Sequence, residues 1–149
     1  MSFKNRGGFT LIEMLVVVAV IGILSSVLLN ALGPAKDKAK DSRIIQEMNQ
    51  VRTLAETIYD GDYNALERLP KPIESIGNEN IRILAEDISK QGGEITLRIS
   101  QDGTNYIAYT PLNIKVGSES APQTNYYCLD SSGRTSFTSS DLSIASRCP

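Results

Sequence analysis

One charged side chain of this sequence stands where a charge is costly. Glu13 belongs to GGFTLIEML, which opens the only long apolar run of the chain. An ionised carboxylate inside a bilayer costs about 3 kcal/mol on insertion scales, and such groups are usually partnered and functional. Either this run lies outside a membrane, or Glu13 has a partner that offsets the cost.

The residues that could carry catalysis or bind a metal form no complete set. The chain has no His, which removes the commonest general base and metal ligand and leaves the C-terminal serines without a histidine to activate them. Asp60, Asp62 and Asn64 match the first three ligands of an EF-hand loop. Ala65 and Lys71 stand where that loop requires its glycine and its bidentate glutamate. We therefore predict a protein that is not an enzyme and that has no metal site and no cofactor.

The two cysteines, Cys128 and Cys148, lie near the C-terminus in a Ser/Thr-rich stretch. Two thiols alone make a poor zinc site, and the spacing is far from that of a C-x-x-C redox motif. The pattern favours a disulfide between them. Because disulfides persist in oxidising compartments, the pairing would place this part of the chain outside the cytoplasm.

The apolar run, FTLIEMLVVVAVIGILSSVLL at residues 9–29, has the length of about 20 residues that a helix needs to cross a bilayer. Lys4 and Arg6 precede it, which places the N-terminus in the cytoplasm by the positive-inside rule. The lysines at positions 36, 38 and 40 weaken this assignment, and the predicted disulfide supports it. A cleaved secretory signal fits less well, because its core would exceed the usual length of about 7–15 residues and because Pro34 follows the nearest small-x-small site.

Beyond the apolar run, the sequence predicts an α+β fold. Apolar residues at spacings of three and four continue from 35 to 58 and predict an amphipathic helix that ends before Gly61. A solvated loop is expected at 59–67 and a short helix at 78–90. Alternating residues predict antiparallel strands at 94–100, 105–110 and 125–129, with a further hairpin strand near 134–138. The expected fold is therefore a long N-terminal helix, with a transmembrane half and an amphipathic half, packed on a small antiparallel β-sheet.

The stretch GGFTLIEMLVVVAVIGILSS resembles the class III signal peptide of type IV pilins and pseudopilins, which combines a short basic leader, a glycine, a phenylalanine and an apolar helix. The resemblance implies that a prepilin peptidase cuts between Gly8 and Phe9, that Phe9 is N-methylated and that the apolar segment is retained. It also implies an assembly role for Glu13, whose carboxylate would neutralise the new amine of a neighbouring subunit. A C-terminal loop closed by a disulfide, here between Cys128 and Cys148, is typical of the pilins.

The same resemblance implies how the chain is organised. Residues 1–8 would be the leader peptide, 9–33 the transmembrane and filament-core half of the helix, and 34–149 an α+β head in the periplasm or outside the cell. The implied function is that of a structural subunit of a type IV pilus, which serves adhesion, motility or DNA uptake. The expected partners are further copies of the chain, the prepilin peptidase and the pilus assembly machinery.

The expected location changes with assembly. Before assembly, the chain would be a single-pass protein of the inner membrane; afterwards it would lie in a surface pilus or a periplasmic pseudopilus. A net charge of -2 indicates no nucleic-acid site of the usual basic kind. Two alternative functions stay open: a pseudopilin of a type II protein secretion system, and a membrane-anchored binding module that does not polymerise.

Overall fold

The computed structural model describes residues 8–66, 68–72, 75–118, 120–140, 142–143 and 145–149, with residue 30 described by its backbone alone. The helices come first in the chain and are α1 (Leu11–Ile58) and α2 (Glu79–Lys90). The strands are β1 (Thr96–Ile99), β2 (Tyr106–Pro111), β3 (Val116–Ser118), β4 (Ala121–Gln123), β5 (Tyr126–Asp130) and β6 (Thr135–Thr138). The predicted α+β class is confirmed.

The chain divides into two compact units between Lys36 and Asp37, and α1 contributes to both. The predicted long helix therefore forms close to its expected ends, and it continues through Pro34. In the first unit, every helical side chain that the structure describes is exposed. This half of α1 has no globular core of its own.

The second unit is built on a four-stranded antiparallel sheet in the order β1-β2-β5-β6. The register pairs Leu97 with Ala108 and Ala108 with Leu129, so these side chains share one face. The strands predicted from alternation are confirmed, with ends shifted by a residue or more. The sequence does not predict the separate two-stranded sheet of β3 and β4, whose described residues are all exposed.

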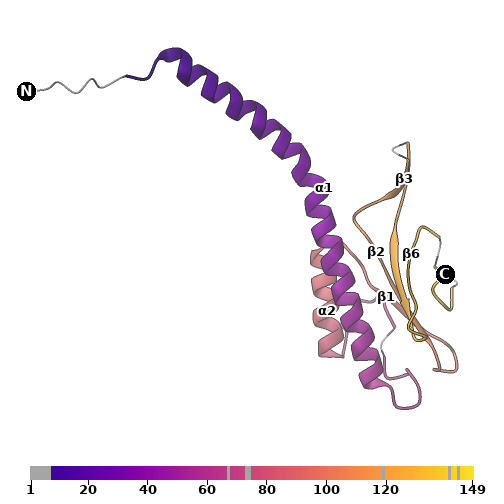
Figure 1. The fold of residues 1–149 in the computed structure, drawn as a ribbon. Helices are drawn as coiled ribbons and strands as arrows, with labels where there is room; N and C mark the ends of the chain where they lie inside the picture. Colours follow the sequence, from indigo (N-terminus) through magenta and orange to yellow (C-terminus); the bar gives the residue numbers. More distant parts are fainter. Residues whose placement is uncertain (1–7, 67, 73–74, 119, 141, 144) are drawn as a thin grey trace, which may run out of the picture. The chain divides into compact units, whose positions relative to one another are not determined.

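Both helices of the second unit cover the same face of the four-stranded sheet (Figure 1). Ile44, Met48, Val51 and Ala55 of α1 recur at spacings of three and four and are at most 1% exposed. They form one core with α2 and the facing side chains of β1, β2 and β5. Burying each of the larger side chains stabilises the fold by about 1.5–3 kcal/mol. This apolar stripe therefore holds the second half of α1 on the sheet.

The opposite face of the sheet carries a smaller core. Ile107 of β2 and Cys128 of β5 are buried there against Leu142 and Cys148. The C-terminal segment thus acts as the cover of this face, because strand side chains alternate between the two sides.

Residues at both ends of α2 explain why it starts and stops where it does. The Asn78 side chain accepts hydrogen bonds from N–H groups of the first turn, as an N-cap does. Gly92 follows the helix with φ of 92°, a left-handed conformation that favours glycine. Gly93 passes so close to the core that an added Cβ would lie 2.8 Å from Thr110 Oγ1. The Gly92-Gly93 pair therefore serves both the turn and the approach to β1.

A buried carboxylate joins α1 to the rest of the second unit. Asp41 is 5% exposed, and its Oδ1 accepts hydrogen bonds from the backbone N–H and side-chain amide of Asn113 at 2.7 and 2.8 Å. Its Oδ2 accepts from the backbone N–H of Ile114 at 2.9 Å. The Asn113 amide also donates to the carbonyl of Gln91, just after α2, at 3.0 Å. Asp41 thus connects α1, the end of α2 and the loop after β2.

The segment at 59–67, expected to be a solvated loop, is partly buried in its described residues. Tyr63 and Leu66 are 5% and 3% exposed. The Tyr63 ring lies edge-on to Tyr106 with 4.8 Å between centroids, and its hydroxyl donates to Glu56 at 3.2 Å. The predicted loop is confirmed, but the expectation that it is solvated is wrong for these two residues, because the acidic pattern around Tyr63 masks two apolar side chains that belong to the core.

Candidate functional site

Glu13 is held in the first turn of α1 by Thr10, the residue before the helix. The Thr10 backbone N–H donates to Glu13 Oε2 at 2.8 Å, and the Thr10 hydroxyl donates to the same oxygen at 2.7 Å. The Glu13 N–H donates in return to Thr10 Oγ1 at 3.3 Å. This reciprocal pair is a capping box, which satisfies N–H groups that have no partner inside the helix.

The capping box leaves one oxygen of Glu13 available. Both bonds from Thr10 end on Oε2, and no hydrogen bond from the described residues reaches Oε1. Phe9 directly precedes the cap and is 77% exposed. The carboxylate can therefore support the helix end and still accept one further donor or cation from outside the chain.

Gly8 lies at the predicted cleavage point, and its surroundings do not require a glycine. No described atom lies within 4 Å of the position that a Cβ would occupy. Gly8 thus satisfies no packing constraint within the described part of the chain. The leader residues 1–7 lie outside the described residues.

The apolar half of α1 presents a continuous hydrophobic surface. Its large apolar side chains between Leu11 and Leu32 are 48–84% exposed. By length and composition, this helix could cross a membrane. Apolar surface in contact with water is unfavourable by about 25 cal/mol per Å². This half of α1 therefore exposes an apolar surface that lipid or other apolar helices could cover.

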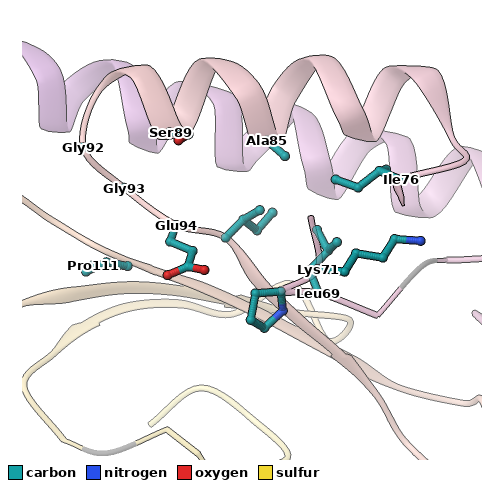
Figure 2. Close-up of a pocket in the computed structure, with 11 residues that line it drawn as sticks. Leu69, Lys71, Ile76, Ala85, Ser89, Gly92, Gly93, Glu94 and Pro111 are labelled. Atoms are coloured by element: carbon teal, nitrogen blue, oxygen red, sulfur yellow. The ribbon is translucent and has the colours of Figure 1, made fainter. Parts of the chain in front are cut away.

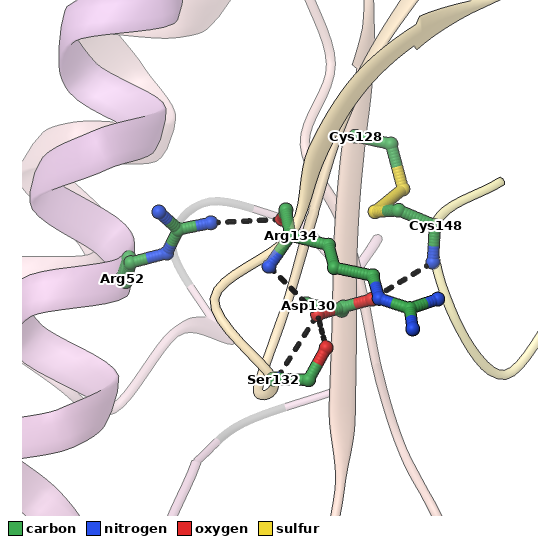
Figure 3. Close-up of a disulfide and its surroundings, with 6 residues drawn as sticks. All are labelled: Arg52, Cys128, Asp130, Ser132, Arg134 and Cys148. Carbon is green, nitrogen blue, oxygen red and sulfur yellow. Dashed lines mark hydrogen bonds between the residues drawn. A yellow bond between two sulfur atoms is a disulfide. The ribbon is translucent and has the colours of Figure 1, made fainter.

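The predicted disulfide between Cys128 and Cys148 is present (Figure 3). Cys128 is in the centre of β5, and the two Cα atoms are 5.8 Å apart, an ordinary separation for a disulfide. Both residues are buried in the core on the far face of the sheet. The covalent bond therefore fastens the C-terminal segment over that face.

Asp130 adds a polar connection beside the disulfide (Figure 3). Its Oδ1 accepts from the Ser132 N–H, the Ser132 hydroxyl and the Arg134 N–H at 2.9, 2.6 and 3.2 Å. Its Oδ2 accepts from the Cys148 N–H at 3.0 Å. Burial alone would raise the pKa of Asp130, but the bonds from Ser132, Cys148 and Arg134 together outweigh it and lower the pKa. The ionised form is thus favoured in the folded protein.

The second unit also contains a pocket of about 440 Å³ beside β1 (Figure 2). Ala85 of α2 lies on one side, and Leu69, Lys71 and Glu94 lie on the other. Ser89 is the hydroxyl in its lining, and the chain has no histidine that could activate it. The pocket thus offers an apolar cavity with charges at its border and no nucleophile–base pair.

The acidic segment that contains Asp60, Asp62 and Asn64 forms a local turn. Asp62 accepts the Asn64 N–H at 2.8 Å, which is a local turn interaction. Among the described residues, no group of three or more His, Cys, Asp or Glu is placed to hold a metal ion.

Two residues that matter in these sites were missed by reasoning from the sequence. Thr10 could have been found, because T-x-x-E before an apolar run is the signature of a capping box. Asp130 begins the stretch Asp-Ser-Ser-Gly, a pattern of residues that favours a turn. Nothing in that pattern indicates that its second oxygen binds the N–H of Cys148, which lies on a distant segment.

Comparisons with known proteins find similarity in the N-terminal region of the chain. Residues 3–29 match the family model described as the prokaryotic N-terminal methylation motif. The type IV wide pilus major component of Thermus thermophilus is 39% identical over 62 residues, which are 42% of this chain and 47% of that protein. The type IV major fimbrial protein FimA of Dichelobacter nodosus is 42% identical over 55 residues, which are 36% of this chain and 35% of FimA.

A third relative, the fimbrial protein EcpB of Eikenella corrodens, is 38% identical over 56 residues, which are 38% of this chain and 35% of EcpB. The matches thus span less than half the length of each of these relatives. No solved structure matches the chain significantly. The methylation motif, which includes the apolar start of α1, and these relatives agree with one another: the N-terminal region of this chain is similar to that of type IV pilins and fimbrial proteins.

Proposed function

We propose that this chain is a structural subunit of a type IV pilus filament, assembled through its N-terminal helix. The observation that carries the proposal is the methylation motif at residues 3–29, which includes the apolar start of α1, whose large side chains are all exposed. A helix that is hydrophobic all round needs apolar neighbours. Lipid supplies them before assembly, and copies of the same helix supply them in a filament.

The orientation before assembly follows from charge and redox chemistry. Lys4 and Arg6 favour a cytoplasmic N-terminus by the positive-inside rule. The disulfide between Cys128 and Cys148 is stable in an oxidising compartment, which for a bacterial inner-membrane protein is the periplasm. Both features support a single-pass topology with the α+β unit on the periplasmic side.

Processing between Gly8 and Phe9 would create the charge that Glu13 needs. In the uncut chain the Phe9 nitrogen is a peptide amide, so an amine exists there only after cleavage. The amine is then N-methylated at Phe9 and enters an apolar helix bundle, where an unpaired charge is expensive. Glu13 Oε1, which Thr10 leaves available, is the acceptor that we assign to the amine of a neighbouring subunit.

This pairing would select subunits in the correct register. Leaving one member of a buried ion pair without its partner costs about 3–5 kcal/mol, which corresponds to a loss of affinity of 100-fold or more. A helix that is shifted along its neighbour would bury both charges unpaired. The pair therefore acts mainly on the specificity of assembly.

Mass spectrometry of the mature chain tests the proposal. The expected N-terminal residue is N-methylated Phe9, and sheared surface filaments should consist of this processed chain. A mature N-terminus beyond residue 33 would mean that the apolar segment is removed, which would refute the proposal. Processed chain that never leaves the cell envelope, combined with failed export of folded enzymes on deletion, would identify a pseudopilin instead.

Two variants separate the charge of Glu13 from its capping role. Glu13→Gln keeps a side chain that can complete a capping box but removes the charge. Thr10→Ala removes the cap partner and keeps the carboxylate. We expect Glu13→Gln to abolish filaments and Thr10→Ala to retain them, with both chains inserted and processed. Filaments of normal yield from Glu13→Gln would contradict the proposed pairing.

A further inference from the structure

We propose that Phe137 of one copy docks into the groove between α1 and α2 of the next copy, as a head-to-tail contact between subunits. The inference rests on the proposed function, because the partner is a second copy of this chain. It assigns the surfaces through which the α+β units meet, whereas the N-terminal motif concerns only the apolar helices.

The projecting side is Phe137 on β6, the last strand in the order of the sheet. Its side chain is 60% exposed, although it is the largest apolar residue of that strand. The ring lies 5.2 Å from that of Tyr127, whose hydroxyl donates to Asn49 Oδ1 at 3.3 Å. Phe137 therefore projects beside the flank of α1 that carries Asn49.

The receiving side is an open groove of about 380 Å³ between the two helices. Leu54 of α1 and Leu84 of α2 form its apolar part, and Ile83, which is 51% exposed, adds to it. The other lining residues are uncharged and polar: Gln50, Thr53, Thr57 and Asn80. The groove thus has an apolar centre and a neutral rim.

The two surfaces lie on opposite flanks of α1, as the sides occupied by α2 and β6 show (Figure 1). Asn49 and Leu54 are five positions apart, which places them about 140° apart around a helix of 3.6 residues per turn. The buried stripe of α1 lies on the longer of the two arcs between them, and the exposed surface of α1 lies on the shorter arc and separates the two surfaces. Phe137 therefore cannot reach the groove of its own chain, and only another copy can bring the two surfaces together.

The chemistry of the two surfaces is matched. The neighbours of Phe137 on β6 are Thr135, Ser136 and Thr138, which are neutral and polar like the rim of the groove. The centres of protein interfaces are depleted of charge and enriched in aromatic residues. A contact between two different patches on identical chains is heterologous, so it repeats without closing and gives an open helical assembly. Apolar helices packed in the same filament would keep these small patches at high effective concentration.

Cysteine crosslinking of assembled filaments tests the contact. The chain has no free cysteine, so Phe137→Cys and Ile83→Cys introduce the only reactive thiols. With a short bismaleimide, the double variant should give a ladder of dimers, trimers and higher species on a denaturing gel. Each single variant should stay monomeric, and filaments mixed from the two single variants should stop at dimers. Dimers from Phe137→Cys alone would indicate a symmetric contact and overturn the proposal.

A matched control uses another exposed apolar residue of the same unit. Val116 is 38% exposed and lies on β3, outside both surfaces. The pair Phe137→Cys with Val116→Cys should give no ladder. A ladder as strong as that of the Phe137 and Ile83 pair would show that crosslinking is non-specific, which would also overturn the proposal.

Filament yield supplies the second measurement. Phe137→Ser and Ile83→Ser should each reduce sheared filaments by about tenfold or more, because each loses the burial of a large apolar side chain at the contact. Combining them should add little, since both remove the same contact. Melting of the detergent-solubilised monomer checks that each variant folds, and Phe137→Tyr should restore assembly.

The outcomes separate this inference from the proposed function. If the unmodified chain forms no filaments in its native host, the proposed function fails. If it forms filaments and folded Phe137→Ser forms them at the same yield, the docking contact alone is refuted.

Discussion

Removing the disulfide should destabilise the second unit by an amount that can be worked out from the chain. The perturbation is the double substitution Cys128→Ala and Cys148→Ala, which keeps both positions apolar in a buried core. The bond closes a loop with a sequence separation of 20. In the chain-entropy model a loop of this size contributes about 3.3 kcal/mol at 25 °C.

Two further losses have the same sign. The Cys148 N–H bond to Asp130 is expected to loosen when the segment is released, at a cost of about 1 kcal/mol. The packing of Leu142 in the C-terminal segment against Ile107 of the sheet would also become less persistent. The expected total is therefore about 3–5 kcal/mol, a large part of the 5–15 kcal/mol that is typical of a folded domain.

The assay is thermal unfolding of the full chain in detergent at pH 7, followed by circular dichroism. The second unit spans Asp37–Pro149. For a domain of roughly 110 residues, a loss of 3.3 kcal/mol lowers Tm by about 14 °C. Ser146→Ala, an exposed substitution inside the same loop, is the control and should leave Tm nearly unchanged. A fall of less than about 3 °C in the double variant, or an equal fall in the control, would refute the reasoning.

The remaining predictions concern buried polar groups and close packing in the same unit. Asp41→Asn should cost about 2–4 kcal/mol in urea unfolding, because an amide N–H₂ would face backbone donors, whereas Asp37→Asn should change stability by less than about 0.5 kcal/mol. Gly93→Ala should cost about 1–3 kcal/mol, since core side chains occupy the position of the new methyl group, and a normal unfolding midpoint would contradict this. The pKa of Glu47 is raised above its ordinary 4.5, mainly by burial and to a smaller extent by the charge of Asp87. The protonated form is therefore the one that the fold favours, so Glu47→Gln should stabilise the protein at pH 7, and the gain should disappear below pH 4.5; an equal gain at both pH values would exclude this cause.

Sequence reasoning succeeded where a local pattern and the tertiary fold agree. Ile95, Leu97 and Ile99 alternate with polar residues, and all three are buried, the last two within β1 and Ile95 just before it. The stripe of α1 was predictable for the same reason, because spacings of three and four place its members on one side of a helix. The pairing of the cysteines needed only their number, since two allow a single intramolecular bond.

Where the prediction failed, contacts distant in sequence decide the structure. Tyr63 sits among acidic and polar neighbours, and only the nearby Tyr106 ring and Glu56 explain its burial. The hairpin of β3 and β4 has no buried residue among those described. Its sequence therefore shows no alternation of apolar and polar residues from which the strands could be predicted. Asp41 is also invisible locally, because the donors that satisfy it lie some 70 positions away in the sequence. Thr10 could have been predicted, since the four consecutive residues 10–13 carry the sequence pattern of its capping box with Glu13.

Asp41 has a mechanical consequence. It is the first buried residue of α1 among those described, so it is the first point at which that helix is fastened to the sheet side of the molecule. Tension applied along the helix would reach its bonds to Asn113 and Ile114 before it reached the stripe that begins at Ile44. Hydrogen bonds lose most of their strength once donor and acceptor are more than about 3.5 Å apart, whereas apolar contacts yield in proportion to the area that is pulled apart. We therefore expect the hydrogen bonds of Asp41 to break together at a threshold force. The apolar contacts of the stripe that begins at Ile44 should then separate gradually as α1 is pulled from the sheet.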